Sequence, residues 1–193
     1  RDPDGDWSSD VCSSDLDAYY WLNITNKYFN KNITQDEVTK YYIHEIMGVS
    51  LKEYDEFYQQ NKFEIHSEQI LREDVQIVIK GLSELHNIYF VTAREKELTM
   101  FTHSYLKRNN IAYDELFVLG SHYKVDKARE LECNVFIEDN YDNAVQLSNA
   151  GFKVLLIDTN YNREPLNGNI VRVYNWKEIY YTINKLLLQS KAV

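Results

Sequence analysis

Hydrophobic positions follow two different periods along the chain. Up to about His66 the apolar and aromatic residues recur at helical spacing, whereas from Asn87 short apolar runs alternate with amphipathic stretches. The runs predict strands over 87–94, 115–121, 134–140, 152–159 and 169–176, with helices over 95–109, 125–132, 141–150 and 177–189. This alternation is typical of right-handed βαβ units. We therefore predict an α/β fold with a parallel sheet, in which FVLG, VFI and VLLI are strands buried on both faces.

Two capping boxes indicate where helices begin in the first third of the chain. The box at 34–37 (TQDE) predicts a helix that runs to Met47, and the box at 50–53 (SLKE) predicts another through Tyr58. A further helix is expected over 69–86. The absence of any strand pattern before this point suggests a small helical insertion or lid.

Residues 1–16 differ from the rest of the chain. They show no helical or strand period, repeat the letters SSD and are rich in acids. The stretch WSSDVCSSDL resembles translated sequencing adapter at the broken end of an assembled gene, although a disordered native tail is the alternative. We therefore divide the chain into a non-native-looking segment 1–16, a helical cap 17–66 and an α/β core 67–193.

Charge and composition narrow the class of partner. The net charge of −9 disfavours binding of a nucleic acid polymer, although a local basic cleft can still hold one phosphate. The apolar runs are too short to span a membrane. Two cysteines do not make a disulfide framework, so we expect a reducing cytoplasm.

Polar clusters follow the predicted strands, at residues 92–94, 120–122, 138–140 and 158–160. Ligands of open α/β sheets bind beyond the carboxyl ends of the strands, so these clusters should meet at one edge. Each cluster has a simpler interpretation, because a polar residue after a strand is often a helix N-cap; Thr92 and Asn140 are the clearest examples. The ordered set of four is more specific than any member.

The residue types suggest phosphate and metal chemistry. Glu138 and Asp139 are adjacent acids at a strand end, and Mg²⁺ is the hard cation that suits such a pair. Thr92 offers a hydroxyl and a backbone N–H at an expected helix N-terminus, which suits a phosphate oxygen. Lys124 can neutralise charge on a phosphoryl group, and Lys127 is the competing lysine.

The chain from Asp17 to about Ile183 resembles the haloacid dehalogenase superfamily of phosphohydrolases. The resemblance rests on the FVT strand end at 90–92, Lys124 and the stretch 138–158, and it is greatest for the nucleotidase-like members grouped with 5′(3′)-deoxyribonucleotidases. It implies a Rossmann-like three-layer core with a helical cap. The implied reaction is Mg²⁺-dependent hydrolysis of a small phosphoester, most simply a nucleoside monophosphate, through an aspartyl-phosphate.

The resemblance also implies roles for individual residues. Mg²⁺ would be held by a first aspartate, by the backbone of a second and by Asp139, with Glu138 holding the water of the metal. Thr92 and Lys124 would stabilise the phosphoryl oxygens. Ala93 and Arg94 complete the expected substrate-binding set, with Arg94 reaching the phosphate or the cap.

The first superfamily motif, Asp-x-Asp-x-Thr after a hydrophobic strand, is the part that fits worst. Asp2 and Asp4 are the nominal matches, but Asp6 stands where Thr belongs and only Arg1 precedes Asp2. We therefore expect a missing central strand and an inactive chain. The alternative function is a non-catalytic phosphate-binding module of the receiver type, although such a domain has no reason to carry helices ahead of its strands.

Overall fold

The computed structural model of the chain describes residues 11–13, 16, 19–166 and 168–190. Its centre is a six-stranded sheet in the order β3-β2-β1-β4-β5-β6, in which every neighbouring pair is parallel. The strands are β1 (Val11–Ser13), β2 (Ile88–Thr92), β3 (Glu115–Val118), β4 (Val135–Glu138), β5 (Lys153–Ile157) and β6 (Ile170–Val173). The predicted parallel α/β fold is confirmed.

The central strand is present, which corrects the expectation that it is missing. β1 lies between β2 and β4, with Ser13 in register with both Phe90 and Ile137. The segment 11–13 has no visible period because it is only three residues long. Its conformation is set by its neighbours, since β2 and β4 each offer backbone N–H and C=O groups that must be paired when buried.

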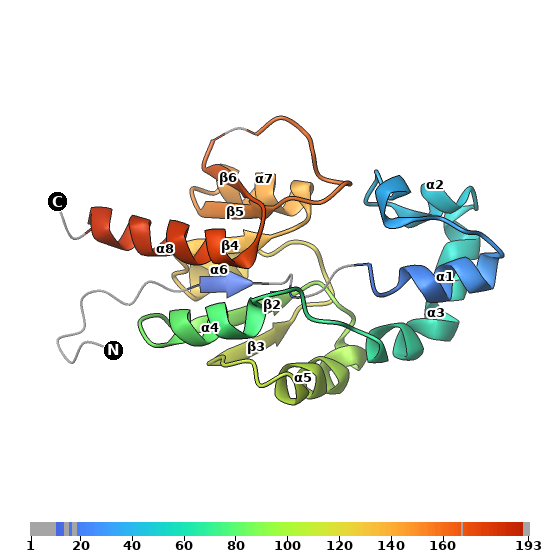
Figure 1. The fold of residues 1–193 in the computed structure, drawn as a ribbon, viewed down its shortest axis with the longest axis horizontal. Helices are drawn as coiled ribbons and strands as arrows, with labels where there is room; N and C mark the ends of the chain where they lie inside the picture. The colour runs from blue at the N-terminus through green and yellow to red at the C-terminus, as the bar shows by residue number, and fades with distance from the viewer. Residues whose placement is uncertain (1–10, 14–15, 17–18, 167, 191–193) are drawn as a thin grey trace.

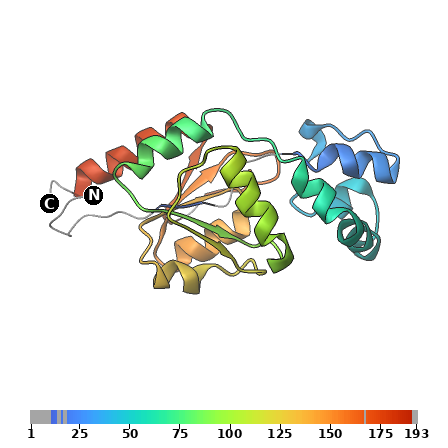
Figure 2. The same ribbon diagram turned by 90° about the horizontal axis from the view of Figure 1, so that it is seen from below.

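The helices are α1 (Leu22–Phe29), α2 (Ile43–Met47), α3 (Leu51–Ser67), α4 (Val75–Ser83), α5 (Thr99–Arg108), α6 (Val125–Glu130), α7 (Tyr141–Asn149) and α8 (Trp176–Ser190). Helices cover both faces of the sheet, with α4 and α8 on one side and α6 and α7 on the other (Figures 1 and 2). The five predicted strands and the helices between them are found close to their expected positions.

Two predicted helices start later than the sequence indicated. The capping box at Thr34 forms, but it opens only the 3-10 turn Gln35–Glu37. The backbone leaves helical geometry at Val38, whose fully buried side chain packs with Leu22 and Met47. Before α4, Asp74 has a φ of 63°, which no α-helix allows. By contrast, α3 begins at the predicted box and runs past Tyr58 to Ser67.

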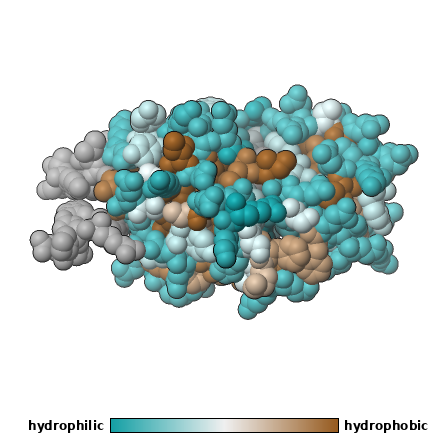
Figure 3. Space-filling model, turned by 60° about the horizontal axis from the view of Figure 1, so that its bottom comes forward, coloured by the Kyte–Doolittle hydropathy of each residue, from teal (hydrophilic) through white to brown (hydrophobic). Residues whose placement is uncertain are grey.

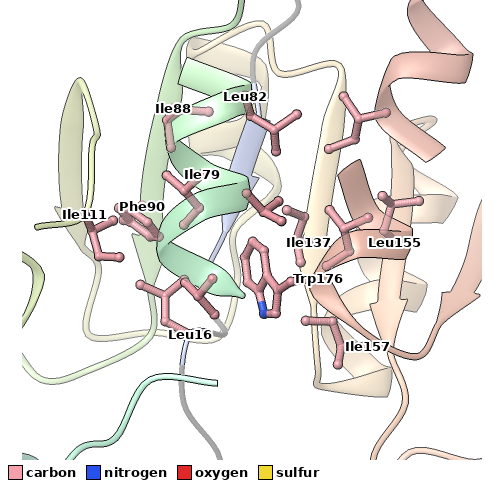
Figure 4. Packing of buried hydrophobic residues seen from close by; sticks show 14 of the residues in the cluster. Leu16, Ile79, Leu82, Ile88, Phe90, Ile111, Ile137, Leu155, Ile157 and Trp176 are labelled. Carbon is pink, nitrogen blue, oxygen red and sulfur yellow. The ribbon is translucent and has the colours of Figure 1, made fainter. Parts of the chain in front are cut away.

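Two hydrophobic clusters hold the sheet between its helices. The larger joins alternate residues of the strands, such as Phe90, Ile137 and Leu155, to α4, α5 and α8, with Trp176 in its midst (Figure 4). The smaller packs the opposite strand faces against α6 and α7. β3 is an edge strand whose residues are half-buried or exposed, so the FVLG run is not buried on both faces as predicted.

Helices α1, α2 and α3 form a separate group beyond the end of the sheet toward which β1 points (Figure 1). Their own hydrophobic cluster contains Leu22, Val38 and Met47. We call residues 19–67 the helical segment. On the face of the molecule drawn in Figure 3, hydrophilic residues predominate and hydrophobic ones form small patches among them.

Two further sequence expectations concern the environment of the chain. None of the described helices combines the length and apolar character needed to cross a bilayer. Cys133, which is buried just before β4, is disulfide-bonded, whereas the sequence led us to expect reduced thiols.

Candidate active site

A cavity of about 520 Å³ lies between the carboxyl ends of the strands and the helical segment. Every predicted site residue within the described part of the chain lines it, namely Thr92, Ala93, Arg94, Lys124, Glu138 and Asp139. Asp2 and Asp4 lie outside the described residues. The structure therefore brings together side chains from the ends of β2 and β4 and from the start of α6, as expected of a parallel sheet.

Thr92 is the last residue of β2 and is 8% exposed. Its Oγ1 accepts a hydrogen bond from the backbone N–H of Arg94 over 3.3 Å, so the hydroxyl closes the turn after the strand. The helical turns after β2 begin at Lys96, with the 3-10 turn Lys96–Leu98 that leads into α5, so Thr92 itself does not stand at a helix N-terminus. Thr92 therefore offers the cavity its hydroxyl and the local backbone, without the dipole of an adjoining helix N-terminus.

Lys124 and Glu138 form a buried ion pair. Lys124 precedes the first residue of α6, and the side chains of both partners are almost fully buried, at 3% and 1% exposure. Lys127 is placed differently: its Nζ lies 2.5 Å from a carboxylate oxygen of Glu130 and 4.5 Å from the ring centroid of Phe117. Of the two candidate lysines, Lys124 lines the cavity.

The adjacent acids Glu138 and Asp139 have separate partners. Glu138 pairs with Lys124, while Oδ2 of Asp139 accepts a hydrogen bond of 2.5 Å from the hydroxyl of Tyr161. The chain's own lysine thus offsets the charge of one carboxylate. A cation therefore does join the acidic pair, and on the Glu138 side it is the ammonium of Lys124.

The backbone of Asp139 is held by the loop after β5. The side-chain amide of Asn162 donates to the carbonyl oxygen of Asp139 over 2.7 Å and to that of Ile157 over 2.8 Å. Asn162 is fully buried, and its Oδ1 accepts from the backbone N–H of Thr159 and from Arg172. The ends of β4 and β5 are thereby joined just where Asp139 enters the cavity.

The cavity offers one donor of the kind that a magnesium ion takes. Mg²⁺ in phosphoryl-transfer sites is bound through one or two carboxylates together with phosphate oxygens and water. Among the described residues no three His, Cys, Asp or Glu side chains cluster as a metal site. Asp139 nevertheless brings a hard carboxylate to the cavity, with one oxygen engaged by Tyr161.

The other polar strand ends have structural partners. Asn140 caps α7 by accepting from the backbone N–H of Asn143 over 2.8 Å, so its N-cap interpretation is confirmed. Asp158 accepts hydrogen bonds from Arg163 and Arg172 and does not line the cavity. The fourth predicted polar cluster, residues 158–160, thus belongs to the loop that holds the backbone of Asp139.

Arg94 lines the cavity and also contacts the connection between α3 and α4. Its Nη1 donates to Gln69 Oε1 and to Thr102 Oγ1, each over 3.2 Å. Gln69 is buried in that connection. The side chain therefore ties the loop after β2 to the chain that leaves the helical segment.

Aromatic side chains of the helical segment form the wall opposite the strand ends; they include Tyr19, Tyr20, Trp21, Tyr41, Tyr42, Tyr54 and Tyr58. Desolvation raises the pKa of Tyr54 to about 12, and it raises the pKa of Tyr41 further, with a contribution from the nearby charge of Asp139. These phenols are therefore protonated at neutral pH. The sequence analysis placed the aromatic residues before His66 on helices and assigned them no site; their number in this part of the chain was the available signal.

His66 is held between two tyrosines of this wall. Its Nδ1 lies 3.0 Å from the hydroxyl of Tyr20 and its Nε2 lies 3.2 Å from that of Tyr58. Burial, with the charge of Arg94 as a further cause, lowers the pKa of His66 to about 3. The imidazole is therefore neutral at neutral pH.

Asp15 and Asp17 are residues that the sequence analysis missed. The boundary drawn after residue 16 separated them, although Asp15-Leu16-Asp17 has the Asp-x-Asp spacing and begins two positions after the last residue of β1. Both aspartates lie outside the described residues. The signal was a β-branched residue and a cysteine just before the pair, in a stretch that was set aside as a whole.

Comparisons with known proteins place these observations in a family. No protein-family model matches the sequence. The chain is 56% identical over 184 residues to a nucleotidase of Clostridium acetobutylicum, covering 95% of this chain and 96% of the relative. It is 31% identical over 160 residues to the Bacillus subtilis protein YqfW, whose name marks it as a candidate nucleotidase, covering 82% and 83% of the two chains.

Solved structures agree on the fold. A haloacid dehalogenase-like hydrolase from Streptococcus pneumoniae has a TM-score of 0.65 at 14% identity and covers 91% of this chain and 98% of its own. A phosphatase, described as predicted, from Clostridium acetobutylicum has the same TM-score and identity, with coverage of 93% and 100%. The chain belongs to the same family as the Clostridium nucleotidase, and its fold is that of the haloacid dehalogenase-like hydrolases.

Proposed function

We propose that the protein is a Mg²⁺-dependent phosphomonoesterase that acts on nucleoside monophosphates. The observation that carries the proposal is the cavity in which Thr92, Lys124 and Asp139 face an aromatic wall. The polar end suits a phosphate and a metal, and the aromatic end suits the base of a nucleotide. Both relatives carry the word nucleotidase in their names, which supports the same substrate class.

The proposed reaction has two steps. An aspartate carboxylate attacks phosphorus, the bond from phosphorus to the ester oxygen breaks, and the alcohol leaves with a proton donated by a second aspartate, which takes a proton from the attacking water in the next step. Water then attacks the aspartyl-phosphate, which releases inorganic phosphate and restores the carboxylate. In both steps the Thr92 hydroxyl and the Lys124 ammonium stabilise the negative charge on the phosphoryl oxygens.

Asp139 is the proposed carboxylate ligand of Mg²⁺ in the described part of the chain. When bound, the ion supplies positive charge that polarises the phosphoryl group. Glu138 acts mainly through Lys124, because the ion pair fixes the ammonium at the edge of the cavity. This role differs from the water-holding role that the resemblance implied for Glu138.

The attacking aspartate is proposed to be Asp15, with Asp17 as the acid and base. Asp15 stands two positions after Ser13 in the sequence, as Thr92 and Asp139 stand two positions after Phe90 and Ile137, the register partners of Ser13. Asp2 and Asp4 remain the competing pair. Tyr19 stands where the motif has Thr, so we expect slower turnover than in a chain that carries the complete motif.

Residues 17–66 are proposed to act as a cap that admits small phosphoesters and excludes larger ones. The support is the contribution of both the helical segment and the strand ends to one cavity. The acidic surface argues against nucleic acid polymers. We also propose a cytoplasmic location, because two cysteines, even with Cys133 paired, do not make the disulfide framework of a small secreted domain.

The test is phosphate release from nucleoside 5′-monophosphates and from glycerol phosphate, with and without Mg²⁺. Lys124→Met should reduce kcat/KM by at least about a hundredfold, in line with the loss of a charged stabilising group. Lys127→Met is the matched control, because Lys127 lies one turn along on α6 and pairs with Glu130 outside the cavity. Equal losses in the two variants, or hydrolysis that ignores Mg²⁺, would contradict the proposed function.

A further inference from the structure

We propose that Tyr161 is a positioning residue that fixes the carboxylate of Asp139 and makes its orientation depend on the helical segment. This inference rests on the proposed function, in which Asp139 holds Mg²⁺. Tyr161 follows β5 in the sequence and lines the same cavity as Asp139. Its two ends contact different parts of the molecule.

The hydroxyl of Tyr161 contacts the core. It donates a hydrogen bond of 2.5 Å to Oδ2 of Asp139. A carboxylate has two oxygens that a rotation of its terminal torsion exchanges, and such torsions are broad. A donor fixed on Oδ2 selects one orientation and presents Oδ1 to a cation.

The ring of Tyr161 contacts the helical segment. Its centroid lies 6.1 Å from that of Tyr19 and 5.9 Å from that of Tyr41, both in edge-to-face geometry. The ring also packs against the cluster of Leu22, Val38 and Met47, which is otherwise made of the segment's own residues. Tyr161 is therefore the residue through which the loop after β5 enters the hydrophobic core of the segment.

The residues on either side of Tyr161 are also held by hydrogen bonds. Asn162, the next residue, is tied to the carbonyl oxygens of Asp139 and Ile157. Asn160, the preceding residue, donates from its side chain to the carbonyl oxygen of Gln35 over 3.1 Å, which joins the loop to the segment a second time. A displacement of the segment must therefore move the Tyr161 ring, and with it the donor on Asp139.

Two substitutions separate the functions of the two ends. Tyr161→Phe removes the hydroxyl and keeps the ring. The Mg²⁺ concentration for half-maximal activity should therefore rise about tenfold, which is the effect of losing one hydrogen bond to a charged group. The KM for the nucleotide should change little. Tyr161→Leu also removes the aromatic contacts. It should raise both the Mg²⁺ requirement and the KM.

The control is Tyr141→Phe. The hydroxyl of Tyr141 donates over 2.9 Å to the carbonyl oxygen of Pro165, and Tyr141 does not line the cavity. Its removal costs one hydrogen bond of a tyrosine hydroxyl without touching Asp139. The variant should keep the wild-type Mg²⁺ dependence.

A second measurement does not require catalysis. The thermal midpoint of each protein is recorded against Mg²⁺ concentration without substrate. Wild type and Tyr141→Phe should show the same saturating rise, and Tyr161→Phe should need about tenfold more Mg²⁺ to reach it. If Tyr161→Phe follows the control in this titration, or if the wild-type midpoint ignores Mg²⁺, the proposal is wrong. If the Mg²⁺ shift differs as expected but no variant releases phosphate, the positioning role stands and the proposed function falls.

Discussion

Asn162 donates a side-chain hydrogen bond of 2.7 Å to the backbone carbonyl of Asp139, and a second of 2.8 Å to the carbonyl of Ile157. One fully buried amide thus joins the ends of two neighbouring strands at the edge of the cavity. Parallel strands share no turn between their ends, and here a side chain bonds to both of them just beyond the last paired residues, Glu138 and Leu156. The candidate metal ligand is held by a residue 23 positions further along the chain.

Replacing Asn162 by Ala should destabilise the protein by about 2–3 kcal/mol, because buried carbonyl and N–H groups lose their partners. The free energy of unfolding in urea measures this loss. Asn61→Ala is the control, since the side chain of Asn61 donates only to Phe57 O within its own helix, over 2.8 Å. A loss no larger than in the control would show that Asn162 does not hold the strand ends.

Lys124→Met should cost about 3 kcal/mol of stability, because it leaves the carboxylate of Glu138 buried without its cation. The double variant Lys124→Met, Glu138→Leu should recover most of that loss, because both charges are then gone, yet it should remain inactive. Urea denaturation of both variants tests this, with Lys127→Met expected within about 0.5 kcal/mol of wild type. A double variant less stable than the single one would argue against a buried ion pair.

The sequence predicted the site residues at the strand ends, but not the loop residues that hold them in place. β2, β4 and β5 are buried apolar runs, and the carboxyl ends of parallel strands must meet, so Thr92 and Asp139 could be placed together. Tyr161 and Asn162 belong to a loop without a period. Their contacts depend on how that loop packs, which no local pattern encodes.

The central strand could not be predicted from its own sequence. β1 has three residues, and its conformation is decided by the two strands that flank it. Strand propensity is a weak guide to secondary structure where pairing with neighbouring strands decides the conformation. Because residues 1–16 were set aside as a whole, both the strand and the Asp15–Asp17 spacing were missed. The helix expected from the capping box at Thr34 failed for a related reason, since burial of Val38 ended it.

Glu95 should make the attachment of the helical segment sensitive to acid. Its carboxylate accepts hydrogen bonds from Lys62 of α3 over 2.6 Å and from Gln59 over 2.8 Å. These bonds, that of Lys62 first, lower the pKa of Glu95 below its ordinary value of 4.5. A lowered pKa stabilises the folded state above the ordinary value, and this contribution is lost as the pH falls through the folded one.

The difference in thermal midpoint between wild type and Glu95→Gln should therefore be largest near neutral pH and shrink as the pH falls below about 4. Glu56→Gln breaks an exposed pair with Lys52 of 3.8 Å and is the matched control. Added salt should weaken the Glu95 effect, because its side chain is 38% exposed. A difference that is constant with pH would contradict the assignment.

His66 should make the fold less stable in mild acid. Its pKa of about 3 lies below the ordinary value of 6.5, so the unfolded chain binds a proton that the folded chain refuses. Stability is then fully present above pH 6.5 and falls as the pH drops toward 3, by about 2 kcal/mol between pH 7.5 and 5. His66→Phe should lower stability at neutral pH but abolish this slope, whereas His103→Phe should keep it. Urea denaturation across the range measures both, and an unchanged slope in His66→Phe would mean that the histidine titrates normally.

Two pairs of aspartates compete for the role of nucleophile, and each has a matched test. If Asp15 attacks phosphorus, Asp15→Asn should reduce phosphate release by at least about a thousandfold, because an amide cannot form the acyl phosphate. Asp2→Asn should then leave turnover unchanged, because the spacing from β1 that matches Thr92 and Asp139 falls on Asp15. Trapping the intermediate with radiolabelled substrate and acid quench checks the covalent step directly: label should appear on wild type and on Asp2→Asn, and should be absent from Asp15→Asn. The reverse pattern would assign the reaction to Asp2, and hydrolysis that survives both substitutions would exclude an aspartyl-phosphate at either position.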